Sequence, residues 1–514
     1  MSSRFPPGVR EDLLTALSRM GAAGQAETEA EESFRKRYLP VSEHARAFDP
    51  DVVLVVGDRG SGKSELFRAV FSLGLLPTIS THVSGVRLQP LKPQATIWRK
   101  GYPVGADFPD ASGQRRFAGK ADSVGQVEEL WFAYLVRTVA DLLRPEDRAA
   151  MSALIDLPGG DADRCYRTFH QLEAQPLLAL DALDRQLVKE DRWIFVGYDE
   201  LDTLGGYDWH VTNAMIRGLT SFWASYARRW VRLRAKLFVR SDLYRRSTET
   251  VGADIAKLAA NRAELSWSDK NMYAMLVKRI ANSDERLYEL CVKARISFNR
   301  DDRLAYVPTL QSAEDARQLI NTLCQQYMGT NSNKGITFRW VLDHVRDGRK
   351  KAHPRSFVRL IERAAEQELN QPRAESRQLL HPVSLRRALD VVSRDHVNQA
   401  QTSEWRWLAG IRDRLAGEEM PQPRRQIENA LRKEWERSWG QNDDVRPPAS
   451  DASELVDYLL EVGVLRARSS VLREVFPAAD GSGIARRRSQ GRIDAPDLYL
   501  AGLEMKRKGG VKRR

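Results

Sequence analysis

Three short apolar runs in the first half of the chain predict buried strands. They are Val52 to Val56, Trp193 to Tyr198, and Lys236 to Val239. Runs of this length without regular polar alternation suit strands of a parallel sheet that is covered on both faces. Each run is followed by polar residues, and in open α/β sheets such residues gather beyond the carboxyl ends of the strands. The pattern therefore predicts an α/β fold built on a parallel sheet.

Helical periodicity dominates most of the remaining chain. Val127 to Leu143 and Pro176 to Leu187 have the spacing of amphipathic helices, and helical patterns prevail beyond about residue 250. Between Thr78 and Gly119 the chain is rich in Pro, Gly and isolated aromatic residues. We expect an irregular insertion in the sheet domain there.

The last segment changes pattern again. Ser453 to Val462 predicts a helix, Val464 to Ala467 a short strand, and Arg492 to Pro496 a returning strand, an order typical of a winged helix. The predicted domains are an N-terminal helical segment (1–45), a P-loop core (46–250) with an insertion at about 78–125, a helical lid (251–370), a helical region (371–445) and a winged-helix-like domain with a basic tail (446–514).

Composition narrows the setting of the protein. The 514 residues carry a formal charge of +12, which permits contact with nucleic acid, and basic residues cluster at Lys506 to Lys508 and Lys512 to Arg514. A solvated tail is the alternative interpretation of that cluster. The three cysteines form no CxxC pair, which favours buried reduced thiols. No secretion signal or membrane-spanning run is evident, so we expect a cytoplasmic protein without a membrane partner.

The segment after the first predicted strand carries the clearest chemistry. It matches GxxxxGK[ST] in full and precedes a helix-compatible stretch. In such a loop backbone N–H groups surround phosphate oxygens, the lysine reaches the β and γ phosphates, and the serine binds Mg²⁺. The pattern predicts an ATP and Mg²⁺ site made by Gly57, Asp58, Arg59, Gly60, Ser61, Gly62, Lys63 and Ser64.

A pair of carboxylates follows the second predicted strand. We expect Asp199 to hold Mg²⁺ through water and Glu200 to orient and polarise the attacking water. The alternative is a helix N-cap in which Asp199, Glu200 and Asp202 complement the helix dipole. Together with the P-loop, the pair is typical of a Walker B motif.

Two arginines are further candidates for nucleotide contact. Arg240 and Ser241 directly follow the third predicted strand, where either could sense the γ-phosphate, and an ion pair with Asp242 is the alternative for Arg240. Arg355 follows Pro354 at the start of a helical segment and could reach nucleotide from a lid, although a surface arginine after a helix-starting proline is the stronger interpretation.

Other chemistries find no support in the sequence. The eight histidines form no HxxxH or HExxH pair, and no Ser-His-Asp arrangement stands out. Trp131, Trp223 and Trp230 lie in helical patterns and are expected to be core or interface residues rather than base-stacking ones.

With these motifs, the chain resembles a bacterial group of P-loop ATPases related to the STAND and AAA+ classes, with features of origin-recognition-type initiators. The resemblance is carried by GDRGSGKS at 57–64, YDELDTL at 198–204, LFVRSDLYRR at 237–246, Phe48-Asp49-Pro50, Pro354-Arg355 and residues 493–510. It implies an ASCE-type core with an added strand between the Walker A and Walker B strands, a helical lid, a winged-helix end, and a place in defence, mobile-element or nucleic-acid-linked systems. The chain departs from the group in the more than one hundred residues between Lys63 and Asp199 and in the lack of a clear arginine finger.

The function expected first is a Mg²⁺-dependent ATPase in which ATP drives a conformational switch coupled to DNA or to a protein partner, or to self-association. The alternative is a DNA-binding or scaffolding protein that holds ATP structurally, with the basic C-terminus contacting double-stranded DNA. A GTPase or small-molecule kinase is a weaker third option, because no NKxD base-reading motif is present.

Overall fold

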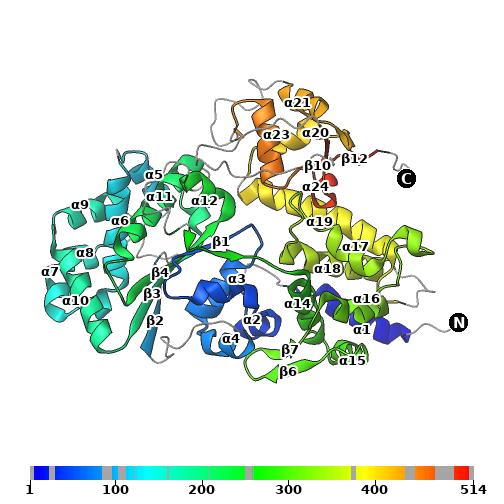
Figure 1. Cartoon of the computed structure of the whole chain (residues 1–514), viewed down its shortest axis with the longest axis horizontal. Coiled ribbons are helices and arrows are strands. Elements are labelled where there is room, and N and C mark those ends of the chain that lie inside the picture. Colours follow the sequence, from blue (N-terminus) through cyan, green and yellow to red (C-terminus); the bar gives the residue numbers. More distant parts are fainter. Residues whose placement is uncertain are drawn as a thin grey trace. The chain divides into compact units, whose positions relative to one another are not determined.

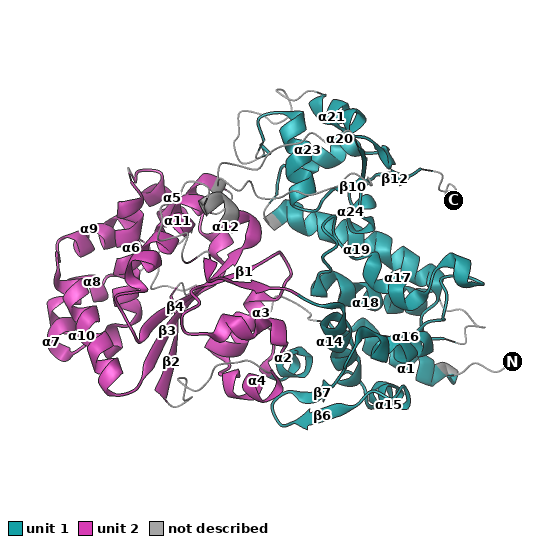
Figure 2. Cartoon of the chain, in the orientation of Figure 1, with its two compact units in different colours: residues 1–23, 32–39, 267–514 teal, residues 24–31, 40–266 magenta. Residues whose placement is uncertain are grey.

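The fold is taken from a computed structural model (Figure 1). The structure describes residues 5–21, 29–83, 95–101, 111–121, 123–158, 161–205, 208–248, 258, 260–371, 378–403, 405–433, 446–447, 449–468 and 491–508. The chain divides into two compact units (Figure 2): one comprises residues 24–31 and 40–266, and the other comprises residues 1–23, 32–39 and 267–514. We call them the sheet unit and the helical unit.

A five-stranded parallel sheet forms the centre of the sheet unit, as the α/β prediction required. Its spatial order is β2-β3-β4-β1-β5, so β4 lies between β1 and β3. The strands are β1 (Leu54–Gly57), β2 (Thr96–Lys100), β3 (Trp193–Tyr198), β4 (Leu233–Arg240) and β5 (Ala263–Leu265). The predicted strand runs thus form β1, β3 and β4, and the added strand between the two Walker strands is present.

Helices connect the strands of the sheet unit. In chain order they are η1 (Ser42–Phe48), α3 (Lys63–Phe67), the π-helical turn η2 (Arg68–Ser72), α4 (Leu76–His82), α5 (Ala111–Ala118), α6 (Val124–Thr138), η4 (Ala140–Leu142), α7 (Pro145–Ala150), α8 (Ser152–Ile155), α9 (Ala162–His170), α10 (Gln175–Lys189), η5 (Leu201–Thr203), α11 (Trp209–Tyr226) and α12 (Ser241–Thr248).

Side chains alternate between the two faces of the sheet, and each face has its own cover. Ile194, Val196 and Tyr198 of β3 belong to a buried cluster with residues of α6, α9, α10 and α11. The intervening Phe195 stacks on Trp98 of β2, on the face where Phe71 of η2 also meets Trp98 edge-on. Apolar side chains therefore cover both faces of the sheet. This explains why the sequences of these strands are continuous apolar runs.

Trp131, Trp223 and Trp230 are core residues, as predicted. All three are at most 1% exposed, and the indole Nε1 of Trp131 donates to the backbone oxygen of Met215, 2.9 Å away. The three cysteines are also buried free thiols.

The segment predicted to be an irregular insertion contributes regular structure instead. Within it β2 pairs in parallel with β3 at the edge of the sheet, and α5 follows. Strand β2 lacks the apolar run of the inner strands because its side chains are only partly covered.

Several basic residues after α11 and in β4 make specific contacts. Lys236 is 2% exposed, and its ammonium donates to the backbone oxygens of Asp49 and Val52. Arg229 pairs with Asp181, and Arg232 pairs with Asp191. These contacts join β4 and the segment before it to α10, to the turn after α10, and to the segment before β1.

The helical unit contains most of the remaining elements. They are α1 (Pro7–Ser18), α2 (Glu31–Arg37), α14 (Asp269–Ala281), α15 (Glu285–Lys293), β6 (Phe298–Asp301), β7 (Ala305–Pro308), η6 (Ala313–Ala316), α16 (Arg317–Leu323), η7 (Ser332–Lys334), α17 (Thr337–Asp343), α18 (Pro354–Asn370), α19 (Pro382–Ser403), α20 (Leu408–Leu415), β8 (Glu419–Met420), β9 (Gln422–Pro423), α21 (Arg424–Arg432), α23 (Ala452–Glu461), β10 (Arg466–Arg468), β11 (Arg492–Asp494), α24 (Asp497–Leu500) and β12 (Lys506–Arg507).

The N-terminal helix α1 packs on α18, which lies far along the chain. Leu13, Leu14 and Leu17 of α1 are at most 1% exposed, and the guanidinium of Arg10 donates to the carboxylate of Glu368 at 2.8 Å. Helix α1 is therefore part of the helical unit rather than a separate segment.

The last described segments, up to residue 508, belong to the same unit. Strands β9, β10 and β11 form an antiparallel sheet in the order β10-β11-β9, and β12 pairs with β8. The backbone N–H of Gly348 donates to the oxygen of Gly463 at 2.7 Å, and a side chain at Gly348 would meet the backbone oxygen of Leu465. Lys506 and Arg507, which the sequence placed in a basic tail, form β12.

Candidate nucleotide-binding site

The phosphate-binding loop predicted at residues 57–64 joins β1 to α3. Gly57 ends β1 and Lys63 begins α3. Gly62 has φ of 96° and ψ of 18°, a left-handed conformation that a residue with a side chain adopts at a cost. This turn places the amino end of α3 at the carboxyl edge of the sheet, where a helix favours an anion.

Lys63 lies folded over its own loop. Its ammonium donates to the backbone oxygens of Gly57 at 2.9 Å and Asp58 at 3.1 Å. Asp58, Arg59, Gly60 and Lys63 are all partly exposed, so the loop is accessible to a ligand. These hydrogen bonds hold the Lys63 ammonium beside the loop. The backbone N–H groups of the loop and this ammonium could then bind phosphate together.

Ser64 and Asp199 meet at this edge of the sheet. Asp199 follows β3, is 8% exposed, and lies close enough to the Ser64 hydroxyl for that group to lower its pKa. Burial raises the pKa of Asp199 to about 7, against the lowering effects of the Ser64 and Glu200 hydrogen bonds and of the Lys63 charge. The structure therefore brings together the two residues expected to bind Mg²⁺.

Glu200 occupies an unusual backbone position next to Asp199. It has φ of 56°, in the left-handed region, and precedes η5. Its side chain makes no capping hydrogen bond to η5, so the N-cap alternative for this carboxylate is not what the structure shows. Glu200 remains partly exposed.

Arg240 ends β4 beside the P-loop. The register aligns it with Gly57 of β1, and its side chain is buried. Its guanidinium binds the carboxylate of Asp242 in a bidentate manner, at 3.1 and 2.6 Å, and lies 3.6 Å from Asp202. The predicted ion pair with Asp242 is present, whereas Asp202 as a second partner was not foreseen. The position of Asp202, three residues after Asp199, was the sequence feature that could have indicated this second partner.

Ser241 and Arg355 differ in their placement. Ser241 is the first residue of α12 and follows Arg240 directly, so it shares the same edge of the sheet. Arg355 is an exposed residue in the first turn of α18, in the helical unit. A contact between Arg355 and nucleotide concerns both units and stays a prediction.

Oxygen ligands suit the proposed cation at this site. Mg²⁺ is commonly held by one or two protein oxygens together with water and phosphate oxygens, and the Ser64 hydroxyl with the adjacent Asp199 carboxylate meets that requirement. Among the residues that the structure describes, no group of three or more His, Cys, Asp or Glu side chains could hold a metal ion.

Comparison with known proteins adds little at the level of sequence. No family model and no curated protein matches the chain. Among solved structures it is similar to that of the Aeropyrum pernix ORC2 protein in ADPNP-ADP complexes, at 12% identity, over 97% of this chain and 96% of that chain, with a TM-score of 0.27. This similarity is too loose to carry a functional argument. Across the described part of the chain, the helices are too short or too polar to span a membrane.

Asp199 should make the stability of the protein depend on pH. Its folded pKa of about 7 exceeds the unfolded value of about 3.9, so its stabilising contribution is complete below about pH 4 and is lost as pH rises through 7. We expect Asp199→Asn to be more stable than wild type at pH 8 by about 1 to 4 kcal/mol, with a smaller gap at pH 5. Urea unfolding without nucleotide at both pH values measures this difference.

The exposed Asp141 provides the control. The side chain of Asp141 belongs to the same sheet unit and is 58% exposed. Asp141→Asn should therefore leave the pH dependence of the free energy of unfolding unchanged. If the free energy of unfolding changes by the same amount between pH 5 and pH 8 in Asp199→Asn and in wild type, the buried carboxyl of Asp199 does not titrate as described.

Proposed function

We propose that the protein is a Mg²⁺-dependent ATPase of the P-loop class, of the ASCE type related to STAND and AAA+ proteins. The observation that carries this proposal is the proximity of Ser64 of the P-loop to the buried Asp199 after β3, across an edge where β4 separates the two strands. A P-loop motif could arise by chance, but its serine would not then meet a buried strand-end carboxylate.

We assign each residue of the site a separate role in hydrolysis. The P-loop backbone and Lys63 bind the phosphates, while Ser64 and Asp199 hold the cation, directly and through water. Bound Mg²⁺ neutralises charge on the phosphate oxygens. Glu200 orients the attacking water and accepts its proton. Arg240, now paired with Asp242 and Asp202, lies where an exchange of partners can report the γ-phosphate, with Ser241 beside it.

The helical unit supplies the proposed output of the switch. We propose that the sheet unit is the nucleotide-binding core, that the helices from about 267 to 403 form the lid region, with Arg355 as its nucleotide contact, and that residues 408–494 form a winged helix. Among the described residues of that last segment, α20, β9, α21, α23, β10 and β11 occur in winged-helix order, with the short strand β8 between α20 and β9, and β9, β10 and β11 form one sheet. The domain then begins well before residue 446, because the two-residue strand β9 belongs to it.

Hydrolysis of ATP by the purified full-length chain tests the proposal. We expect turnover that requires Mg²⁺ and is removed by EDTA, measured as phosphate release, together with binding of a fluorescent ATP analogue. Nucleotide binding without turnover, both with and without double-stranded DNA, would instead favour a scaffold that holds ATP. Absence of binding would contradict the nucleotide site itself.

A DNA-binding scaffold is the second candidate, favoured by the exposed arginines of β10 and β11. A protein partner or self-association remains part of the switch hypothesis. We also propose a cytoplasmic location, since reduced buried thiols are typical of that compartment.

A further inference from the structure

One face of the small C-terminal sheet is lined by arginines. In the antiparallel pair β10–β11, Arg466 lies opposite Asp494 and Arg468 lies opposite Arg492. Residues two apart on a strand share a face, so these four side chains share one face. The intervening pair, Ala467 and Ile493, points to the other face, where Ile493 is fully buried.

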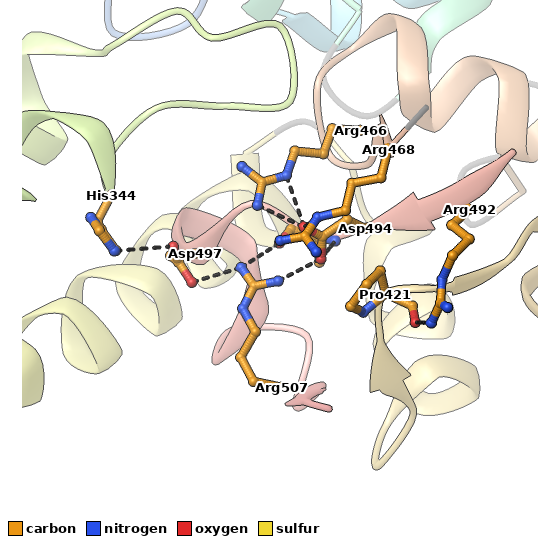
Figure 3. A network of polar contacts seen from close by, with 9 residues as sticks. His344, Pro421, Arg466, Arg468, Arg492, Asp494, Asp497 and Arg507 are labelled. Carbon is orange, nitrogen blue, oxygen red and sulfur yellow. Dashed lines mark hydrogen bonds and ion pairs between the residues drawn. The ribbon is translucent and has the colours of Figure 1, made fainter. Parts of the chain in front are cut away.

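The carboxylate on this face is already neutralised. Figure 3 shows Arg466, Arg468 and Arg507 converging on Asp494. Asp494 is fully buried; burial alone raises its pKa, but Arg466, Arg507 and Arg468 outweigh that effect and hold the pKa below its usual value. Arg507 also pairs with Asp497 at 2.7 Å. Three guanidinium groups thus contact two carboxylates, and Arg492 on the same face adds a further positive charge.

The pair Arg468 and Arg492 is unfavourable for folding by itself. Like charges directly opposite each other on neighbouring strands destabilise a sheet. Arg468 is 57% exposed at the side chain and reaches Asp494 only at 3.1 Å, while the exposed Arg492 donates to the backbone oxygen of Pro421 at 2.6 Å. Two cations held together at the surface suit an anionic ligand that both can contact.

The helix that precedes this hairpin has the opposite charge. Helix α23 carries Glu454, Asp457 and Glu461 and no lysine or arginine. In helix-turn-helix proteins the second helix of the motif enters the major groove, where such carboxylates would meet phosphate charge at close range. Asp457 is also paired with Arg424 of α21. Helix α23 is therefore unsuited to reading DNA.

The residues of this sheet and of the cleft beside it indicate which class of anion can bind. Strands β9, β10 and β11 contain no aromatic residue on which a single-stranded base could stack. Beside Arg492 a cleft of about 470 Å³ is also lined by Glu418 and Glu419, which disfavours phosphate inside the cleft itself. What remains is the open strand face, which fits a rigid phosphate backbone.

We infer that the β10–β11 face, through Arg466, Arg468 and Arg492, binds the phosphate backbone of double-stranded DNA without reading its sequence, and that α23 does not enter the groove. This inference deepens the DNA-binding candidate function and does not depend on ATP hydrolysis. It assigns the contact to the strands of the winged helix, upstream of the basic residues at the end of the chain.

The test is the salt dependence of binding to a labelled 30-base-pair duplex, followed by fluorescence anisotropy between 50 and 200 mM salt. Arg468→Ala/Arg492→Ala in the full chain is expected to weaken binding roughly tenfold at 100 mM salt and to reduce the slope of log K against log salt by about 2, because two phosphate contacts are lost. The variant should remain folded, because Arg466 and Arg507 still pair with the buried Asp494, and thermal unfolding of the variant checks this.

Two controls make the outcome specific. Lys293→Ala/Arg300→Ala removes the same charge from exposed positions of the same unit, and should change the slope little. Glu461→Gln on α23 should leave binding unchanged or tighten it. Absence of duplex binding by wild type, equal losses in both double variants, or a loss with Glu461→Gln would each overturn the inference. Tighter competition by double-stranded RNA than by DNA would overturn the choice of DNA.

ATP turnover measured on the same preparations separates this inference from the ATPase proposal. If Arg468→Ala/Arg492→Ala loses DNA binding and retains basal hydrolysis, both proposals stand. If wild type hydrolyses ATP but binds no duplex, only the inference about the strand face fails. If it binds duplex through these arginines but neither binds nor hydrolyses ATP, only the ATPase proposal fails.

Discussion

Replacing Lys63 with alanine should weaken ATP binding by at least about 100-fold, or about 3 kcal/mol. The ammonium of Lys63 now donates to the backbone oxygens of Gly57 and Asp58, and a phosphate would replace these neutral acceptors with charged ones. Hydrogen bonds to charged groups contribute roughly 1.5 to 3 kcal/mol each. The measurement is titration with a fluorescent ATP analogue in the presence of Mg²⁺.

Lys120→Ala is the matched control for that variant. Lys120 belongs to the same unit and is 69% exposed, with only a long contact to Asp163 at 3.4 Å. Its removal should leave nucleotide affinity unchanged, and both variants should retain the unfolding midpoint of wild type. ATP affinity in Lys63→Ala close to that of wild type would remove the P-loop from the proposed site.

Glu200→Gln should preserve nucleotide binding and lower the rate of hydrolysis by about 10² to 10⁴-fold, the usual contribution of a positioned general base. The amide has nearly the same shape but cannot accept a proton from water. Because Glu200 makes no capping hydrogen bond to η5, its replacement removes no helix cap. Single-turnover phosphate release at saturating ATP separates the chemical step from binding.

Glu190→Gln controls for the loss of a carboxylate. Glu190 lies at the end of α10, where it pairs with Arg192 at 2.9 Å, and its side chain is 37% exposed. The Glu190→Gln protein should hydrolyse ATP at the rate of wild type. A Glu200→Gln protein with an undiminished rate would show that another group activates the water, and weak ATP binding by the variant would indicate a disturbed site.

The inner strands and the P-loop could be predicted because their signals are local. Strands β1, β3 and β4 are covered on both faces and therefore appear as apolar runs, and the glycines of the P-loop mark its turn. Strand β2 was missed because it lies at the sheet edge with partly covered side chains. Strand β5, with three residues, is too short to give a pattern.

Most electrostatic partners could not be predicted, because pairing between residues far apart in the sequence depends on tertiary structure. Nothing local indicates that Lys236 is buried against the backbone oxygens of Asp49 and Val52 rather than exposed. The pair of Arg240 with Asp242 was among the expectations from the sequence, but only the fold shows that Arg240 also contacts Asp202. The roles proposed for Glu200, Arg240, Ser241 and Arg355 remain predictions.

The docking of α1 on α18 has a consequence for protein synthesis. Arg10 and its partner Glu368 are 358 residues apart, so the ribosome completes the whole sheet unit before the partner of α1 emerges. At about 5 to 20 residues per second this interval is roughly 20 to 70 s. During it the leucines of α1 lack their final cover. Nascent chains or expressed fragments that stop before residue 370 should therefore attract chaperones or aggregate through this first helix.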